Sequence, residues 1–218
     1  MIWMDAPTGM GDEAPPPPPA FRLTCPAGCI VGGRHLDGPG CLTTLRRDLG
    51  LAVRLALRAA ERLESVPRDA RTVCLFRVAF GYVPWHRVPT ATRSADAGAL
   101  TAHRFRQVAA ALERHPIHFE CRAQPAAHPD RNAAVPRVLG GHANRNTIWL
   151  YPRYWSRRRP VRLGVLVHEA LHLFDSMGDQ GIAPRRALNA HCYEWLVLGL
   201  NGLAGESSDL CSCRVTPP

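Results

Sequence analysis

The residues best suited to chemistry are His168, Glu169 and His172, which form the pattern H-E-x-x-H within VRLGVLVHEALHLFD. On an α-helix, residues four positions apart lie on one face, so both imidazoles can reach one metal ion. Glu169 follows the first histidine, where its carboxylate can hold a water molecule and take its proton. Zinc lowers the pKa of such a water to about 7. The spacing therefore predicts a zinc site with Glu169 as general base.

The competing interpretation is a core helix in which both histidines are merely hydrogen-bonded. The neighbours of the motif favour the catalytic interpretation, because they make the other sides of the helix apolar, as a buried active-site helix requires. These neighbours are Val165, Leu166, Leu171, Leu173 and Phe174.

A zinc hydrolase needs a third protein ligand and an open fourth position. Four candidates follow the motif: Asp175, Asp179, His191 and Glu194. Asp175 is expected to belong to the same helix, whereas Asp179 lies in a turn that could return its carboxylate to the metal. His191 and Glu194 belong to a helix predicted over residues 184–200. Asp179, His191 and Glu194 all remain possible as the third ligand.

The elements that position these residues follow from hydrophobic periodicity. Apolar residues at steps of three and four predict helices over residues 42–64 and 96–114, and a proline follows each. Strands are expected at residues 72–80, 117–122, 135–139 and 146–151. Helices and strands are mixed without regular alternation, so the expected fold class is α+β.

The chain is expected to hold one domain behind a leader. Residues 1–20 contain an unbroken proline run at 15–19, which predicts an extended, disordered segment. Residues 21–218 are expected to form a single domain with its core at about residues 42–203. No apolar run approaches the roughly 20 residues of a membrane span, so no membrane partner is expected.

The net charge of +9 comes from 27 basic residues, all of them arginine. Basic chains can bind nucleic acid. The arginines are scattered apart from Arg157, Arg158 and Arg159 with nearby Arg162, and no nucleic-acid-binding motif is visible. An Arg-rich nucleic-acid binder is therefore the weaker alternative, and a protein or peptide substrate is the expected partner. The oligomeric state is left open.

The eight cysteines leave two interpretations open. Cys25 with Cys29, and Cys211 with Cys213, could staple the two ends of the chain in an oxidising compartment. The first ten residues lack the basic and apolar regions of a secretory signal, which favours reduced thiols equally. We expect a protein that is cytoplasmic as synthesised or is exported by a non-classical route.

Several short stretches, in order, resemble the deuterolysin-like zinc metalloendopeptidases (aspzincins), which include the peptidyl-lysine endopeptidases. The resemblance covers roughly residues 45–200. It comprises an F-x-C element at 119–121, an N-x-I-x-L-x-P strand at 146–152, the pair Tyr154-Trp155, the H-E-x-x-H helix and N-A-H-C-Y-E at 189–194. It implies a zincin-like fold, a small mixed sheet with an H-E-x-x-H active-site helix, and zinc-dependent endopeptidase activity.

The resemblance also implies site residues, with two departures. The family's third ligand is the aspartate of a G-T-x-D-x-x-Y-G turn, which falls on Asp179. The family tyrosine, which would stabilise the oxyanion, is replaced by Ile182, so Tyr193, His142 or an arginine would have to substitute. His191 stands where the family has aspartate, which makes a site of three histidines the alternative.

In zincins the edge strand beside the active-site helix pairs with an extended substrate. The resemblance therefore implies a substrate cleft at Asn146 and Ile148, with Tyr193 nearby. A second class of function stays open, in which a zincin-like domain with weak or no catalysis serves binding or structure. The changed turn and Ile182 favour that alternative.

Overall fold

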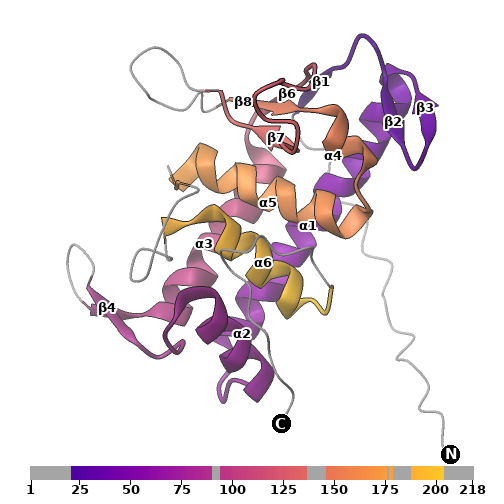
Figure 1. Ribbon diagram of the computed structural model, residues 1–218. Helices are drawn as coiled ribbons and strands as arrows, with labels where there is room; N and C mark the ends of the chain where they lie inside the picture. Colours follow the sequence, from indigo (N-terminus) through magenta and orange to yellow (C-terminus); the bar gives the residue numbers. More distant parts are fainter. Residues whose placement is uncertain (1–20, 90–93, 137–145, 176, 179–187, 204–218) are drawn as a thin grey trace, which may run out of the picture.

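The computed structural model describes residues 21–89, 94–136, 146–175, 177–178 and 188–203 (Figure 1). These residues form six helices and three small sheets, so the expected α+β class is confirmed. Figure 1 shows the main sheet at one end of the molecule and helix α2 at the other, with helix α1 running between them. The proline-rich leader and the residues after Leu203 lie outside the described ranges.

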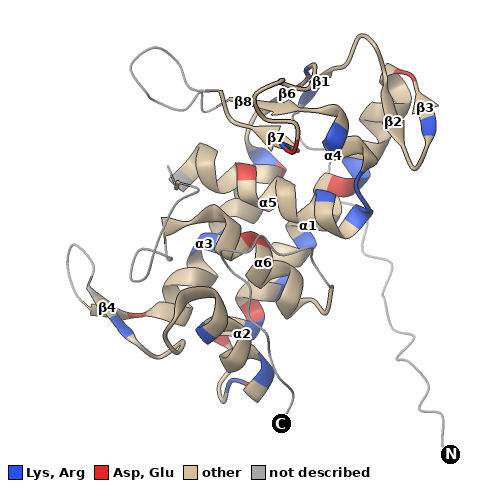
Figure 2. Ribbon diagram, viewed as in Figure 1, with Lys and Arg blue, Asp and Glu red and all other residues tan. Residues whose placement is uncertain are grey.

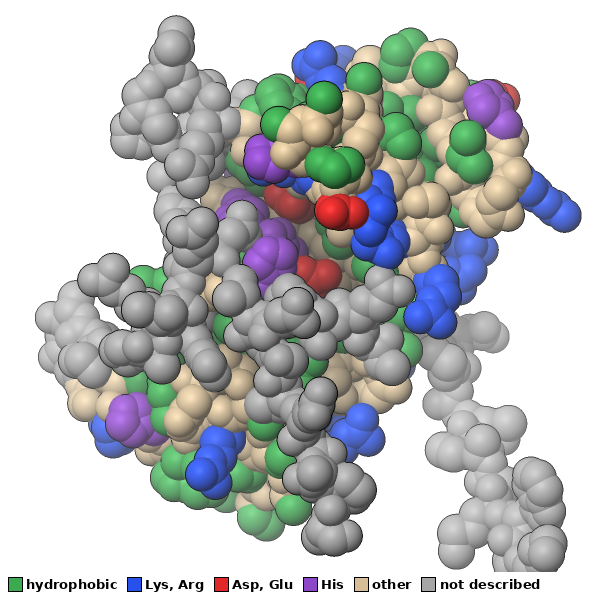
Figure 3. All heavy atoms as spheres, in the orientation of Figure 1, with side chains coloured by type: hydrophobic (Ala, Val, Ile, Leu, Met, Phe, Trp, Pro, Cys, Tyr) green, Lys and Arg blue, Asp and Glu red, His purple; other side chains and the backbone are tan. Residues whose placement is uncertain are grey.

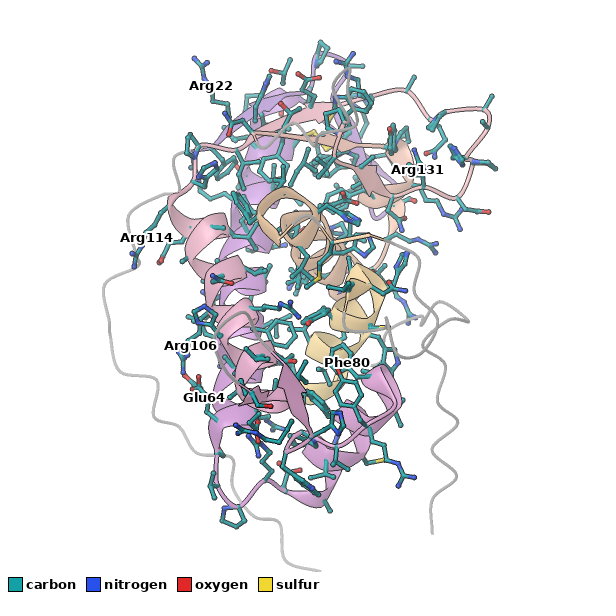
Figure 4. The ribbon with its side chains drawn as sticks, turned by 90° about the vertical axis from the view of Figure 1, so that its left-hand side faces the viewer. Arg22, Glu64, Phe80, Arg106, Arg114 and Arg131 are labelled. Atoms are coloured by element: carbon teal, nitrogen blue, oxygen red, sulfur yellow. A yellow bond between two sulfur atoms is a disulfide. The ribbon has the colours of Figure 1, made fainter. Side chains whose placement is uncertain are left out.

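Helices α1 (Gly38–Glu64) and α3 (Ala97–Arg114) confirm the two helices predicted from periodicity. Each begins at an aspartate, Asp37 or Asp96, whose carboxylate accepts a backbone N–H of the first turn. The two helices pack along each other, and an ion pair joins Arg106 to Glu64 (Figure 4). They form the scaffold on which the later helices rest.

Residues 72–80 were predicted as a strand, and this prediction is wrong, because they belong to helix α2 (Ala70–Phe80). The carboxylate of Asp69 accepts the Thr72 N–H at 2.8 Å and starts the helix. Gly81, with φ of 85°, ends it in the left-handed conformation that glycine adopts most readily. The β-branched and aromatic residues of α2 suggest a strand locally, but these two caps and burial of one helical face decide the outcome.

The main sheet has the strand order β1-β6-β8-β7. Its members are β1 (Arg22–Thr24), β6 (His118–Cys121), β8 (Thr147–Leu150) and β7 (Ala133–Ala134). The first three run parallel and β7 is antiparallel to β8. Phe119 and Ile148 are paired neighbours and both are fully buried in the core.

The predicted strands at 117–122 and 146–151 correspond to β6 and β8 and are confirmed. The strand predicted at 135–139 is displaced, because the structure places β7 two residues earlier and residues 137–139 lie outside the description. Two hairpins complete the strands: β2 (Cys29–Val31) with β3 (Arg34–Leu36), and β4 (Arg87–Pro89) with β5 (Ser94–Asp96).

Three helices follow β8 in sequence: α4 (Pro152–Ser156), α5 (Arg159–Asp175) and α6 (Ala190–Leu200). Helix α5 contacts α1, α3 and α6, so the core surrounds it. Helix α6 covers the second half of the predicted 184–200 helix, and residues 184–187 are not described. Within the described ranges, none of the helices combines the length and apolar character that a membrane span requires.

A buried ion pair fixes α5 to α1. Arg162 Nε donates to Asp48 Oδ2 at 2.7 Å, and the two side chains are only 5% and 0% exposed. The Arg162 guanidinium also donates to the Arg157 carbonyl at 2.8 Å. Arg162 is therefore a structural residue and not part of a basic surface patch, and Figure 2 shows basic residues spread over both halves of the molecule.

Two disulfides hold the sheet end together. Cys25 is joined to Cys121, and Cys29 is joined to Cys41. The first ties the residue after β1 to β6, and the second ties β2 to the first turn of α1. Cys25 and Cys29 are therefore oxidised, each with a partner farther along the chain. Cys211 and Cys213 lie outside the described residues.

Replacing Cys25 and Cys121 together with serine should lower the free energy of unfolding by about 2–4 kcal/mol, since the cross-link restricts the unfolded chain. The loop it closes spans 96 residues. Urea unfolding followed by circular dichroism measures the change. Cys74→Ser is the matched control, because Cys74 is partly exposed and outside both disulfides. Equal stability of the double variant and the parent chain would contradict this prediction.

Candidate metal centre

The H-E-x-x-H residues lie near the end of α5, where the helix is surrounded by other elements. His168 and Glu169 are 6% and 4% exposed, which is rare for such side chains unless their environment compensates the loss of water. In Figure 3, histidine and acidic side chains gather in a hollow between the sheet end and the helical half of the molecule. His168 and Glu169 are thus almost fully enclosed by the protein.

The two motif histidines face each other. The Nε2 atoms of His168 and His172 are 2.9 Å apart, and the ring centroids are 4.6 Å apart. Two nitrogens that share one tetrahedral zinc ion, each about 2.0–2.1 Å from it, lie roughly 3.3 Å apart. The observed separation is somewhat shorter than that value.

The proton on His172 can be placed from its hydrogen bond. His172 Nδ1 lies 2.6 Å from the backbone carbonyl oxygen of Met177, which can only accept. Nδ1 therefore carries the proton, and Nε2 directs its lone pair toward His168. This pattern, in which Nδ1–H binds a carbonyl and Nε2 remains available as a ligand, is the usual outer-shell arrangement of metal-binding histidines.

The segment after α5 returns to the start of α6. The Gly178 N–H donates to the Leu188 carbonyl at 3.1 Å, and the Ala190 N–H donates to the Gly178 carbonyl at 3.0 Å. Asn189 then caps α6, since its side-chain oxygen accepts the His191 N–H at 2.9 Å. These bonds bring the first turn of α6 beside the last turns of α5.

His191 and Glu194, one turn apart on α6, complete the cluster. Glu194 Oε2 is 3.3 Å from His168 Nδ1 and 3.4 Å from His191 Nδ1. Burial alone would raise the pKa of Glu194, but hydrogen bonding and the charges of the two histidines lower it to about 2. Ligand atoms of His168, His191 and Glu194 lie within 4.8 Å of one another, so this group could hold a metal ion.

The contacts of His168 separate the two sides of its ring. The Glu194 carboxylate oxygen lies 3.3 Å from Nδ1 of His168, so Nδ1 is the nitrogen placed to donate toward it. In each ring Nε2 is then the nitrogen that faces the other histidine, and the two Nε2 atoms are 2.9 Å apart. Two lone pairs at this distance repel unless a cation, either a metal ion or a proton, lies close to both.

The other predicted site residues differ in whether the structure describes them and in whether they lie at the cluster. It brings His191 to the cluster, with its ring centroid 4.3 Å from that of His168. Asp179, the other expected third ligand, lies outside the described residues, as do His142 and Ile182. Asn146 is exposed just before β8, and its side-chain oxygen is 3.2 Å from His115 Nε2.

Two residues expected in a substrate cleft are instead in the core. Ile148 and Tyr193 are both fully buried. The Tyr193 hydroxyl accepts a hydrogen bond from Arg104 at 2.6 Å, and burial raises the pKa of this phenol to about 12. The ring packs against Phe80 and Phe105, so Tyr193 serves packing rather than substrate contact.

The strand expected at the sheet edge has a second neighbour over part of its length, because β7 pairs with β8 at Trp149 and Leu150. Sequence reasoning further missed the contact of the Met177 carbonyl with His172 and the close approach of the Glu194 side chain to Gly164. A glycine inside an otherwise apolar helix was the available signal for a close approach.

Comparison with known proteins adds no assignment. A scan against protein-family models finds no match, and a search of curated proteins finds no significant relative. The residues and their geometry are therefore the basis for the function proposed below.

Proposed function

We propose that the chain is a zinc-dependent endopeptidase in which His168 and His172 bind the metal through Nε2. The observation that carries this proposal is the 2.9 Å separation of these two atoms, with each Nδ1 beside an oxygen atom. Imidazole nitrogens with carboxylate or histidine as further ligands form a donor set that suits zinc. When bound, zinc supplies a Lewis acid that polarises a peptide carbonyl and makes a water molecule more acidic.

Glu169 is the proposed general base. It follows His168 directly on α5 and is 4% exposed, so its carboxylate acts in a partly water-excluded setting. There it accepts a proton from the attacking water and passes this proton to the leaving amine. The proton thus ends on the new amino terminus, and the hydroxyl of water ends on the new carboxylate.

For the third ligand, the sequence and the geometry favour different residues. The turn pattern favours Asp179, whereas the ring contact with His168 favours His191. In such a site, the contact between Glu194 and His191 Nδ1 would hold the ring so that Nε2 is the ligand atom. We therefore propose His191 as the third ligand, with Asp179 as the alternative that mutation decides.

The strand edge offers a place for an extended substrate. The antiparallel strand β7 lies at the edge of the sheet and contacts α5. A peptide that pairs with an exposed strand edge gains backbone hydrogen bonds irrespective of most side chains. We propose that the substrate lies along β7, in place of the interior strand β8.

Metal content tests the proposal most directly. We expect about one zinc per purified wild-type chain, lost in His172→Ala and in either His191→Ala or Asp179→Ala. Inductively coupled plasma mass spectrometry of each protein, after reconstitution and desalting, gives the stoichiometry. Circular dichroism spectra of the variants verify that they are folded. A wild-type chain that binds no zinc would make His168 and His172 core histidines and overturn the proposal.

A closed zinc site without catalysis is the second candidate. The position of His191 beside His168 favours it, because His191 and Asp179 together could add two ligand atoms to those of the motif histidines and leave no place for water. Four protein ligands are typical of structural zinc sites. An X-ray absorption spectrum fitted by four protein ligands, with no exchangeable oxygen, would support this candidate over the peptidase.

A further inference from the structure

The side chain of Glu194 reaches across from α6 to the back of His168, and Gly164 makes this approach possible. A Cβ atom added at Gly164 would lie 2.9 Å from Glu194 Cγ and 2.9 Å from Leu198 Cδ1. The Glu194 Oε1 atom would be 3.2 Å away. No side chain larger than hydrogen fits at position 164 unless both Glu194 and Leu198 shift.

Gly164 lies one helical turn before His168, so the two residues share a face of α5. Glycine in a helix interior costs about 1 kcal/mol relative to alanine. At Gly164 the cost is accompanied by a gain in space, because the absent Cβ leaves the room that the Glu194 side chain occupies. The carboxylate thereby arrives next to His168 Nδ1.

Glu194 contacts His168 on the side of the ring away from His172. Its Oε2 lies 3.3 Å from Nδ1 of His168, whereas Nε2 faces His172. A ligand to a metal shared by the two Nε2 atoms would have to lie on the other side of the imidazole. His191 Nδ1 contacts the same Oε2 at 3.4 Å and holds the carboxylate from a second direction.

We propose that Glu194 is a positioning residue for the metal centre: its carboxylate, passing over Gly164, holds the Nδ1–H of His168 so that Nε2 points at the metal. This inference rests on the proposed zinc site and deepens it. A carboxylate in this position fixes the tautomer and orientation of the ring and makes Nε2 a stronger donor. Loss of such an outer partner typically costs about 10–100-fold in metal affinity.

Two substitutions at Glu194 separate positioning from direct ligation. Glu194→Ala removes the acceptor, so the zinc dissociation constant should rise about 10–100-fold. Glu194→Gln keeps an acceptor oxygen and should lose clearly less affinity than the alanine variant. The affinity is measured by competition with a chromophoric chelator. Glu113→Ala, on α3, is the matched control and should bind zinc like the wild type.

The absorption spectrum of the cobalt(II)-substituted protein gives a readout independent of activity. We expect wild type and Glu194→Gln to show the same d–d band pattern, because the ligand set is unchanged. An unaltered zinc affinity in Glu194→Ala would overturn the inference. So would a Glu194→Gln variant that loses metal as completely as His172→Ala, since Glu194 would then be a ligand.

Gly164→Ala tests the route of the side chain without changing any polar group. Its Cβ should displace Glu194 and weaken zinc binding in the same direction as Glu194→Ala. Gly199→Ala is the matched control, because its Cβ would meet only the flexible end of Leu75, at 3.2 Å. Equal affinities of the Gly164→Ala and Gly199→Ala variants would contradict the route over Gly164.

Different outcomes would contradict the proposed zinc site and the positioning role of Glu194. A wild-type chain without zinc removes the proposed function and the inference together. A wild-type chain whose zinc depends on His172 but not on Glu194 keeps the proposed function and removes only the positioning role.

Discussion

Glu169→Gln should reduce peptide hydrolysis by at least about 10²–10⁴-fold while zinc remains bound. Glutamine preserves the size and shape of the side chain but cannot accept a proton from water at neutral pH. Metal binding should persist, because His168 and His172 provide their Nε2 atoms independently of residue 169. A peptide library analysed by mass spectrometry, with zinc content measured on the same samples, gives both quantities.

Two outcomes would contradict this prediction. An unchanged rate would show that Glu169 is not the general base. Loss of zinc along with activity would show that Glu169 maintains the metal site itself. Glu113→Gln is the matched control, because it makes the same chemical change on α3, on a partly exposed side chain that pairs with Arg114.

Asp48→Asn should lower the free energy of unfolding by about 3–5 kcal/mol, because it leaves the buried Arg162 guanidinium without its counter-charge. Both side chains are removed from water, so solvent cannot replace the lost partner. The change should be visible as a lower midpoint in urea at constant slope. Because Arg162 begins the second turn of α5, the site helix loses its fixed position against α1.

A double substitution shows what the ion pair contributes. Asp48→Leu combined with Arg162→Met removes both charges and should recover much of the stability lost in Asp48→Asn. Glu64→Gln is the exposed counterpart, where loss of the pair with Arg106 should cost no more than about 1 kcal/mol. A loss below about 1 kcal/mol in Asp48→Asn would contradict the view that this pair is buried and essential.

The parts of the fold that were predictable are those set by local pattern. Helices α1 and α3 carry long apolar repeats with aspartate caps, and tertiary packing reinforces what the sequence already favours. Helix α2 was missed because propensity was weighed above its end signals, although Asp69 and Gly81 mark a helix start and stop. The pairing of Cys25 with Cys121 depends on strands brought together across 96 residues, which no local pattern encodes.

The residues of the candidate site likewise differ in whether local sequence or tertiary packing places them. His168, Glu169 and His172 are close in sequence, so helix geometry alone places them together. The role of Glu194 depends on how α6 packs on α5, which in turn depends on the backbone bonds of Gly178 and on the space at Gly164. The burial of Tyr193 was equally inaccessible, because its side of α6 is decided by the position of α2.

The glycine at position 164 also limits how this protein can evolve or be engineered. Alanine is the most common way to stiffen a helix, and selection for heat resistance alone would favour it at helical glycines. At Gly50, where a Cβ would meet only the tip of Arg54 at 3.8 Å, nothing opposes such a change. At Gly164 alanine would stiffen the helix but displace Glu194 from His168. A thermostable descendant that keeps its zinc should therefore keep this glycine.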